Sequence, residues 1–143
     1  MEYIASSQAL TGYNVRIWNR PAFVIRGYTL IAPPSPRGGA LIGEFWNQVK
    51  ADGRLDKLKS ASSIPPWVLG LGSWDPECPK HGQRYTICIE ETDHTDFSAL
   101  SQEYPLFTKE IGASDWMCFE ITTMQLYDRL WKDNKAYQTI FWY

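Results

Sequence analysis

The sequence predicts an α+β fold in which two pseudo-symmetric strand-helix-hairpin modules form an antiparallel sheet with two helices on one face. Several short runs, rich in β-branched and aromatic residues, alternate between polar and apolar positions as strands do. Other segments space their apolar residues as amphipathic helices do. The order of these elements recurs after roughly 90 residues, which indicates an internal duplication. We therefore expect residues 1–143 to form a single domain.

The first module spans about residues 14–91 and opens with two strands. Residues 14–18 alternate, and residues 22–31 form a second extended run after a break at 19–21. Residues 1–12 have no clear period, so we expect an arm or a short helix there.

A helix and a hairpin complete the first module. The helix is expected to end near Gly53, with a weaker turn through Leu55 and Leu58. Residues 67–74 and 84–90 predict the two strands of a hairpin, joined by a loop longer than a tight turn. Large apolar residues form the helix stripe and the inward face of the second hairpin strand: Leu41, Ile42, Phe45, Trp46 and Val49, and then Tyr85, Ile87 and Ile89.

The second module spans about residues 104–143. Residues 106–111 and 116–121 predict two strands, and Thr122 or Thr123 is a candidate cap for the helix that follows. A closing hairpin like that of the first module is missing from this sequence. The apolar stripe expected for the second helix consists of Met124, Tyr127, Leu130 and Trp131, extended by Tyr137, Phe141 and Trp142.

Composition and charge argue against several classes of protein. The formal net charge is −2, whereas a nucleic-acid partner calls for a basic surface. No apolar run approaches the length of a membrane span, and no secretory signal is recognisable. Three cysteines cannot all pair within one chain, which favours a reducing cytoplasm. We expect no cofactor, because the sequence has neither a P-loop nor a dinucleotide fingerprint.

Aromatic content is the feature that bears most on function: the chain has seven Trp, eight Tyr and six Phe. Each such side chain buries roughly 150–250 Å², so a few of them fill the core of a small domain. The surplus predicts either a tryptophan-rich core or a cavity with aromatic walls. Such a cavity suits a flat or cationic small molecule.

Five segments carry a resemblance to a known family: residues 15–27, 42–46, 67–72, 84–89 and 116–121. They resemble the GyrI-like domain, which is also the effector-binding domain of AraC- and MerR-type transcription factors. The resemblance implies a ligand groove along the pseudo-twofold axis, between the helices of the two modules. It also implies that hydrophobic cations bind there, held by aromatic walls and a buried carboxylate.

The sequence departs from that family at both ends. Residues 1–12 are too short for a helix-turn-helix, so we expect no nucleic-acid binding by this chain alone. The missing final hairpin carries an acidic pocket residue in many relatives. Its absence predicts either an early end of the chain or a second subunit that covers the open sheet edge, as in a homodimer.

An acidic residue and five aromatic residues are the candidate ligand contacts. Glu120 shares its strand face with Trp116 and Cys118, so it is a candidate counter-charge for a cation. The alternative is a solvated carboxylate at the end of the strand, and Glu90 has the same two alternatives. The five aromatic candidates lie on faces expected to look toward the groove, although some of them belong to the core. The full set is Glu120, Trp46, Trp67, Tyr85, Trp116 and Tyr127.

No catalytic or metal-binding residues are predicted. Cys78 and His81 lie close together in the sequence but lack the second ligand pair of a zinc site. Cys88 and Cys118 lie in apolar strands, where a thiol is usually inert.

Three hypotheses of function follow. The first is non-catalytic sensing or sequestration of a hydrophobic, cationic small molecule. The second is a hydrolase of reactive toxins on the same scaffold, in which Glu120 or Glu90 orients water or donates a proton. The third is a protein that inhibits DNA gyrase by contact, as some relatives of the family do.

Overall fold

The computed structural model describes residues 2–7, 15–63, 68–98, 100, 103–119 and 140–142. The chain divides into two compact units. Unit 1 contains residues 1–22 and 112–139, and unit 2 contains residues 23–111 and 140–143. The expectation of a single domain stays a prediction.

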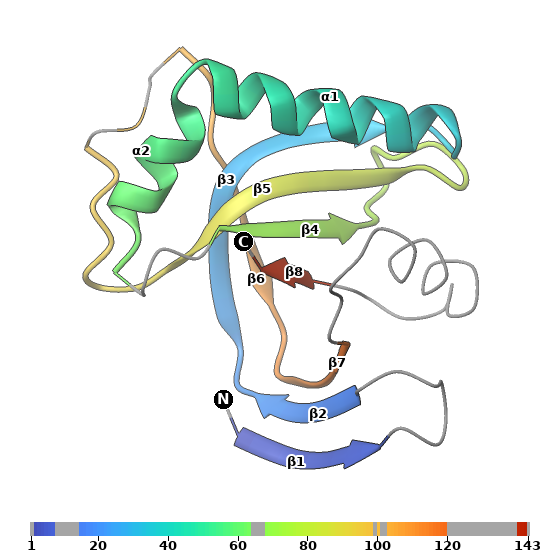
Figure 1. Cartoon of the computed structure of the whole chain (residues 1–143), viewed down its shortest axis with the longest axis vertical. Coiled ribbons are helices and arrows are strands. Elements are labelled where there is room, and N and C mark those ends of the chain that lie inside the picture. Colours follow the sequence, from blue (N-terminus) through green and yellow to red (C-terminus); the bar gives the residue numbers. More distant parts are fainter. Residues whose placement is uncertain are drawn as a thin grey trace. The chain divides into compact units, whose positions relative to one another are not determined.

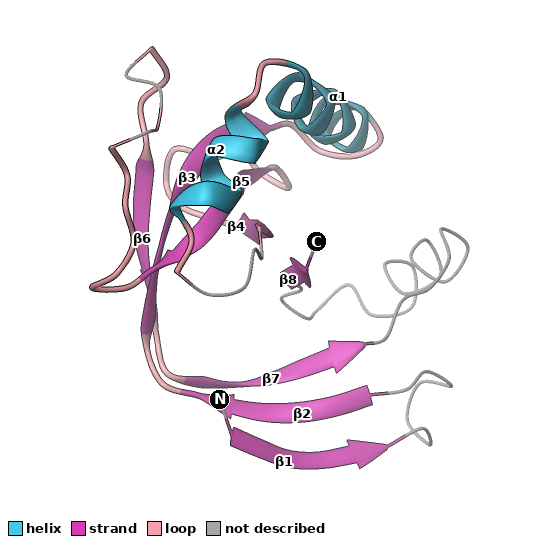
Figure 2. Cartoon of the chain, turned by 60° about the vertical axis from the view of Figure 1, so that its left-hand side comes forward, coloured by secondary structure: helices cyan, strands magenta, loops and turns pink. Residues whose placement is uncertain are grey.

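Unit 1 contains a three-stranded antiparallel sheet, with the order β1-β2-β7 (Figure 2). Its strands are β1 (Glu2–Ser7), β2 (Val15–Arg20) and β7 (Ser114–Phe119). The Asn19 side-chain amide donates a 2.9 Å hydrogen bond to Asp115 Oδ1 across the β2–β7 pair. The expected arm or short helix at the start of the chain is wrong for residues 2–7. Backbone pairing with β2 makes them a strand, although their side chains show no period.

Unit 2 contains a five-stranded antiparallel sheet with the order β6-β3-β5-β4-β8 (Figure 1). The strands predicted in residues 22–31, 67–74, 84–90 and 106–111 are all present. The bounds are β3 (Phe23–Ala32), β4 (Leu69–Ser73), β5 (Gln83–Glu91), β6 (Phe107–Ile111) and β8 (Ile140–Trp142).

Two helices cover one face of this sheet. The first is α1 (Arg37–Ala51), and Figure 1 shows it running along β3 and β5. The second is α2 (Arg54–Ala61), which contains the predicted turn through Leu55 and Leu58. Gly53 separates them with a φ of 85°, a conformation that glycine adopts without steric cost. The predicted end of the first helix is therefore confirmed.

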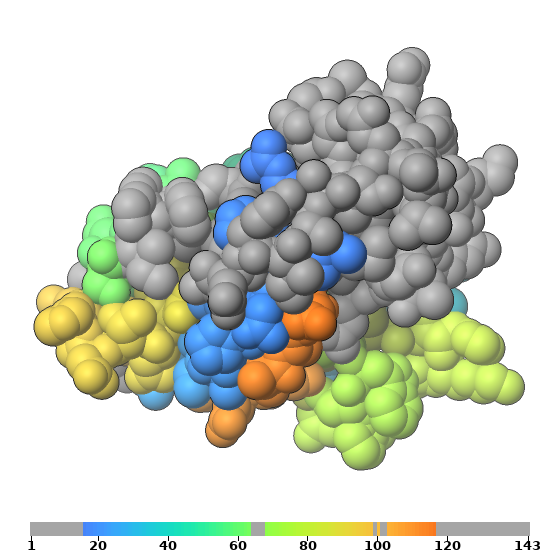
Figure 3. Space-filling model, turned by 90° about the horizontal axis from the view of Figure 1, so that it is seen from below, coloured from blue at the N-terminus to red at the C-terminus, as the bar shows by residue number. Residues whose placement is uncertain are grey.

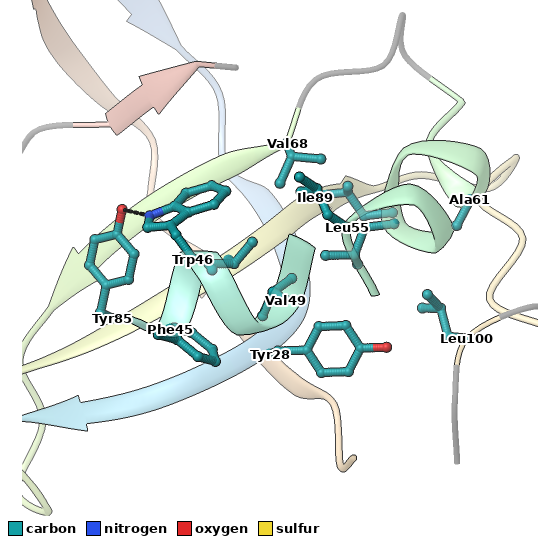
Figure 4. Packing of buried hydrophobic residues seen from close by; sticks show 12 residues of the cluster. Tyr28, Phe45, Trp46, Val49, Leu55, Ala61, Val68, Tyr85, Ile89 and Leu100 are labelled. Atoms are coloured by element: carbon teal, nitrogen blue, oxygen red, sulfur yellow. Dashed lines mark hydrogen bonds between the residues drawn. The ribbon is translucent and has the colours of Figure 1, made fainter. Parts of the chain in front are cut away.

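The core of unit 2 lies between these helices and the sheet (Figure 4). Tyr28 of β3 pairs with Ile87 of β5, and Tyr85, Ile87 and Ile89 all belong to the same buried cluster. The predicted inward face of β5 is confirmed. From the helices, the cluster takes Phe45, Trp46, Val49, Leu55, Leu58 and Ala61.

The α+β class with antiparallel sheets and two helices is confirmed, but both described helices come from residues 37–61. The helix expected to begin near Thr122 lies outside the described residues, which resume at residue 140. Its expected continuation through Phe141 and Trp142 is wrong. Residues 140–142 form β8, because they pair with residues 69–71 of β4, and such aromatic and β-branched residues suit a strand. Among the described residues, neither helix is long and apolar enough to cross a membrane.

Candidate functional site

Three of the six candidate ligand contacts lie in the described part of the chain. Trp46 and Tyr85 belong to unit 2, and Trp116 is buried in β7 of unit 1. Trp67, Glu120 and Tyr127 lie outside the described residues. The structure therefore brings together one pair of the predicted contacts, Trp46 with Tyr85.

The Trp46–Tyr85 pair joins helix α1 to strand β5. Trp46 Nε1 donates a 3.0 Å hydrogen bond to the Tyr85 hydroxyl oxygen. The ring centroids are 6.4 Å apart and the ring planes are inclined at 69°, which is an edge-on arrangement. Each residue is 9% exposed. Figure 4 shows the two rings meeting beside α1, with this hydrogen bond between them. The bond satisfies a buried indole N–H and fixes the orientation of both rings.

Gly70 provides the space that the two rings occupy. It pairs with Ile87, so it lies on the sheet face that carries Tyr85 and the helices. A Cβ atom at residue 70 would clash with the Tyr85 hydroxyl oxygen and lie 3.1 Å from Trp46 Cζ2. Only glycine leaves room for the rings above β4. The sequence alone does not reveal this role of Gly70, because it depends on the pairing register of β4 and β5.

A positive charge already lies beside this pair. Lys50 follows Trp46 by one helical turn, and its Nζ atom lies over the indole ring at 5.9 Å from the centroid. The Lys50 residue is exposed. The face of Trp46 is thus oriented toward a cationic group, which is the geometry of a cation–π contact.

The acidic candidates do not join the pair in the described residues. Glu90 pairs with Ile25 on the sheet face opposite to Tyr85, because neighbouring residues of a strand alternate between faces. Glu91 forms a 3.0 Å ion pair with Arg26. Glu90 is therefore separated from the Trp46–Tyr85 pair by the sheet, and Glu120 remains the predicted counter-charge.

Two buried arginines contact other rings in unit 2. Arg54 lies over Tyr104 at 3.9 Å and over Tyr28 at 5.0 Å, and its Nε atom forms a 2.9 Å ion pair with Asp52. Through Arg54, the first residue of α2, the Tyr104 ring is held close to the start of this helix. Sequence reasoning did not find these contacts, because an arginine after a glycine looks like any solvated helix start.

Arg84 fastens the β4–β5 loop, residues 74–82, to the sheet. Its Nε atom lies 2.6 Å from Asp75 Oδ2, its Nη2 atom donates to Glu77, and its guanidinium lies over Phe107 at 4.5 Å. The hydrogen bond from Arg84 holds the pKa of the Asp75 carboxyl below its usual range. Figure 3 shows the loop as a yellow-green lobe of the surface, and Trp74 at its start is 61% exposed.

The described residues offer little for covalent or metal chemistry. Cys78 and Cys88 are both buried free thiols. Burial raises the pKa of the Cys88 thiol, which leaves it as the unreactive neutral form. Within the part of the chain that the structure describes, no three His, Cys, Asp or Glu side chains gather as metal ligands. The Cys78 Sγ atom donates to Asp75 Oδ1 at 3.7 Å, and His81 is exposed.

Comparison with known proteins identifies the fold through solved structures. No family model matches the sequence, and no curated protein matches it. The structure of SAV2435 bound to tetraphenylphosphonium covers 99% of this chain and 81% of that chain, with a TM-score of 0.63 and 15% identity. A Staphylococcus aureus MU50 protein, described as a candidate bacterial transcription regulation protein, covers 92% of this chain and 85% of its own, with a TM-score of 0.65 and 14% identity.

A third structure, an integron cassette protein from the mobile metagenome of Vibrio cholerae, covers 90% of this chain and 87% of its own. Its TM-score is 0.56 and its identity 15%. At these identities the likeness shows the fold alone. The shared fold is consistent with the GyrI-like effector-binding class that the sequence resembles.

Proposed function

We propose that this protein is a non-catalytic, GyrI-like binding protein for a hydrophobic, cationic small molecule, and that Trp46 and Tyr85 form part of its ligand-binding wall. One observation carries the proposal. The two rings are held above the bare backbone of Gly70, in a fold shared with a protein whose structure contains tetraphenylphosphonium. Their fixed orientation means that a ligand would meet a preformed surface.

The chemistry of the pair suits a lipophilic cation. An indole face attracts a positive charge by about 0.5–1 kcal/mol at an exposed site, and by about 2 kcal/mol or more when the cation is desolvated. The Lys50 ammonium group lies over the same ring, in the geometry of a cation–π contact. An apolar cation such as tetraphenylphosphonium would add the burial of its own phenyl surface.

The remaining predicted contacts keep their proposed roles. Glu120 stays the proposed counter-charge for the cation, and Trp67, Trp116 and Tyr127 stay proposed aromatic ligand contacts. A buried carboxylate in such a wall is energetically costly when no ligand is bound, and a bound cation stabilises it. The carboxylate therefore favours positively charged ligands. The residues of this chain need no covalent step for that role.

Calorimetric titration with tetraphenylphosphonium tests the proposal. We expect saturable, stoichiometric binding to the full chain and a loss of about tenfold in affinity for Trp46→Phe, since the smaller ring has a weaker π face. Trp74→Phe is the matched control, because Trp74 is exposed in a loop and lies outside the proposed wall. Equal losses for the two variants, or no saturable heat for the wild type, would remove the proposal.

Turnover distinguishes the binder from the hydrolase. Each candidate ligand is incubated in large excess over the protein and then examined by mass spectrometry. We expect the ligand to be recovered unchanged, with binding that stops at stoichiometry. Product that accumulates beyond one equivalent would replace the binding protein with an enzyme on the same scaffold.

A further inference from the structure

Lys50 places a positive charge beside the proposed ligand wall of Trp46 and Tyr85. It lies in the last turn of α1, and its ammonium nitrogen is 5.9 Å from the centroid of the Trp46 ring. Its side chain is long and flexible, with a compact and strongly hydrated charge at its end. Such a group can approach or leave an aromatic face without any movement of the backbone.

The Trp46 ring, in contrast, is held in place. Its N–H donates to Tyr85, and both residues are 9% exposed. Rotation of the indole would break this hydrogen bond and leave a buried donor without its acceptor, which is costly. A ligand cation that approaches the ring face under Lys50 must therefore displace the ammonium group, because the ring is held in place and cannot turn away from it.

We propose that Lys50 is a specificity-determining residue, an internal cation that competes with cationic ligands for the Trp46 ring. This inference rests on the proposed function and specifies its charge selectivity. The displaced ammonium group stays close to the ligand on its flexible stem, so two like charges share one region of the surface. The affinity of the site then depends mainly on the apolar area and ring shape of the ligand. The positive charge of the ligand adds less to the affinity than it would if Trp46 and Tyr85 formed the wall without Lys50.

Two probes of the same shape and opposite charge test this competition. Tetraphenylphosphonium and tetraphenylborate are titrated calorimetrically, in potassium-free buffer, into the wild type and Lys50→Met. We expect Lys50→Met to bind the phosphonium about five- to tenfold more tightly, because the competing contact and the like charge are both removed. We expect the borate to bind about five- to tenfold less tightly. Lys50→Arg, which restores a cation over the ring, returns both affinities to near the wild-type values.

Lys57→Met is the matched control, because it removes the same charge from an exposed position on α2. It should change neither affinity more than about twofold, since exposed charges are well screened. Equal effects of Lys50→Met and Lys57→Met would mean that the change in affinity comes from the net charge of the protein and not from the position of Lys50, which would overturn the inference. Phosphonium binding that is unchanged in Lys50→Met would overturn it while leaving the proposed function intact. Binding of neither probe to any variant would remove the proposed function and this inference together.

Discussion

Gly70→Ala is the substitution that tests the geometry of the Trp46–Tyr85 pair most sharply. The added Cβ would clash with the Tyr85 hydroxyl oxygen and lie 3.0 Å from its Cζ atom, so the Tyr85 ring must move. A displaced ring loses the hydrogen bond from Trp46 Nε1. The clash occurs on the buried helix-facing side of the sheet, where neighbouring side chains are packed closely.

The expected cost follows from three contributions. A buried N–H without its acceptor costs about 1–3 kcal/mol, and overpacking costs about 1–3 kcal/mol. Replacing glycine by alanine offsets about 0.4–1 kcal/mol of this cost, because alanine lowers the conformational entropy of the unfolded chain. We expect Gly70→Ala to lower the free energy of unfolding by about 1–5 kcal/mol, measured by urea denaturation.

Tyr85→Phe shows whether the hydroxyl group is the cause. It deletes the oxygen that the new Cβ would meet, so Gly70→Ala should cost at least about 1 kcal/mol less in the Tyr85→Phe background. Gly43→Ala is the matched control, because it lies within α1 and a Cβ there meets no atom within 4 Å. It should stabilise the protein by about 0.5–1 kcal/mol. An equal cost of Gly70→Ala in both backgrounds would refute the reasoning.

Three further predictions concern the rest of unit 2. Arg54→Met should lower the free energy of unfolding by about 1–2 kcal/mol, because it removes the ring contacts with Tyr28 and Tyr104 and the ion pair with Asp52. The exposed Lys57→Met should stay within about 0.5 kcal/mol of the wild type in the same urea titrations. Asp75 has a lowered pKa in the folded state, so its contribution to stability is present above its ordinary pKa of 3.8 and is lost as the pH falls through the lower folded value. Urea titrations from pH 6 to pH 2 should therefore show a smaller loss of stability in Asp75→Asn, and an unchanged pH profile would contradict the Arg84–Asp75 contact. Cys88 should resist iodoacetamide at pH 8 in the native protein and react in urea, as peptide mass mapping would show, because burial both shields its thiol and raises its pKa. Rapid native labelling of Cys88 would mean that β5 is not buried as described.

Periodicity predicted the parts of the fold in which local sequence and burial agree. Strand β5 alternates cleanly, because one of its faces packs against the helices, and the apolar stripe of α1 has the same origin. Residues 2–7 and 140–142 were not predicted as strands, because each is defined by its pairing with a distant segment. Propensity carries no information about such partners.

The candidate site was predictable in its residue types but not in its contacts. Aromatic content and spacing selected Trp46 and Tyr85, and both lie in one contact. The role of Gly70 depends on the register between β4 and β5, which the sequence does not state. The position of Lys50 over the indole depends on which flank of α1 carries Trp46, and this is decided by the packing of the helix on the sheet.

The central claim is that the Trp46 indole faces a ligand. The most direct measurement is the indole N–H resonance of Trp46 in a ¹⁵N-labelled sample, assigned by its disappearance in Trp46→Phe and followed during titration with tetraphenylphosphonium. We predict a saturable shift of this resonance, with the same affinity as the calorimetric titration, while the exposed Trp74 indole stays unchanged. A bound phosphonium that leaves the Trp46 resonance in place would contradict the claim.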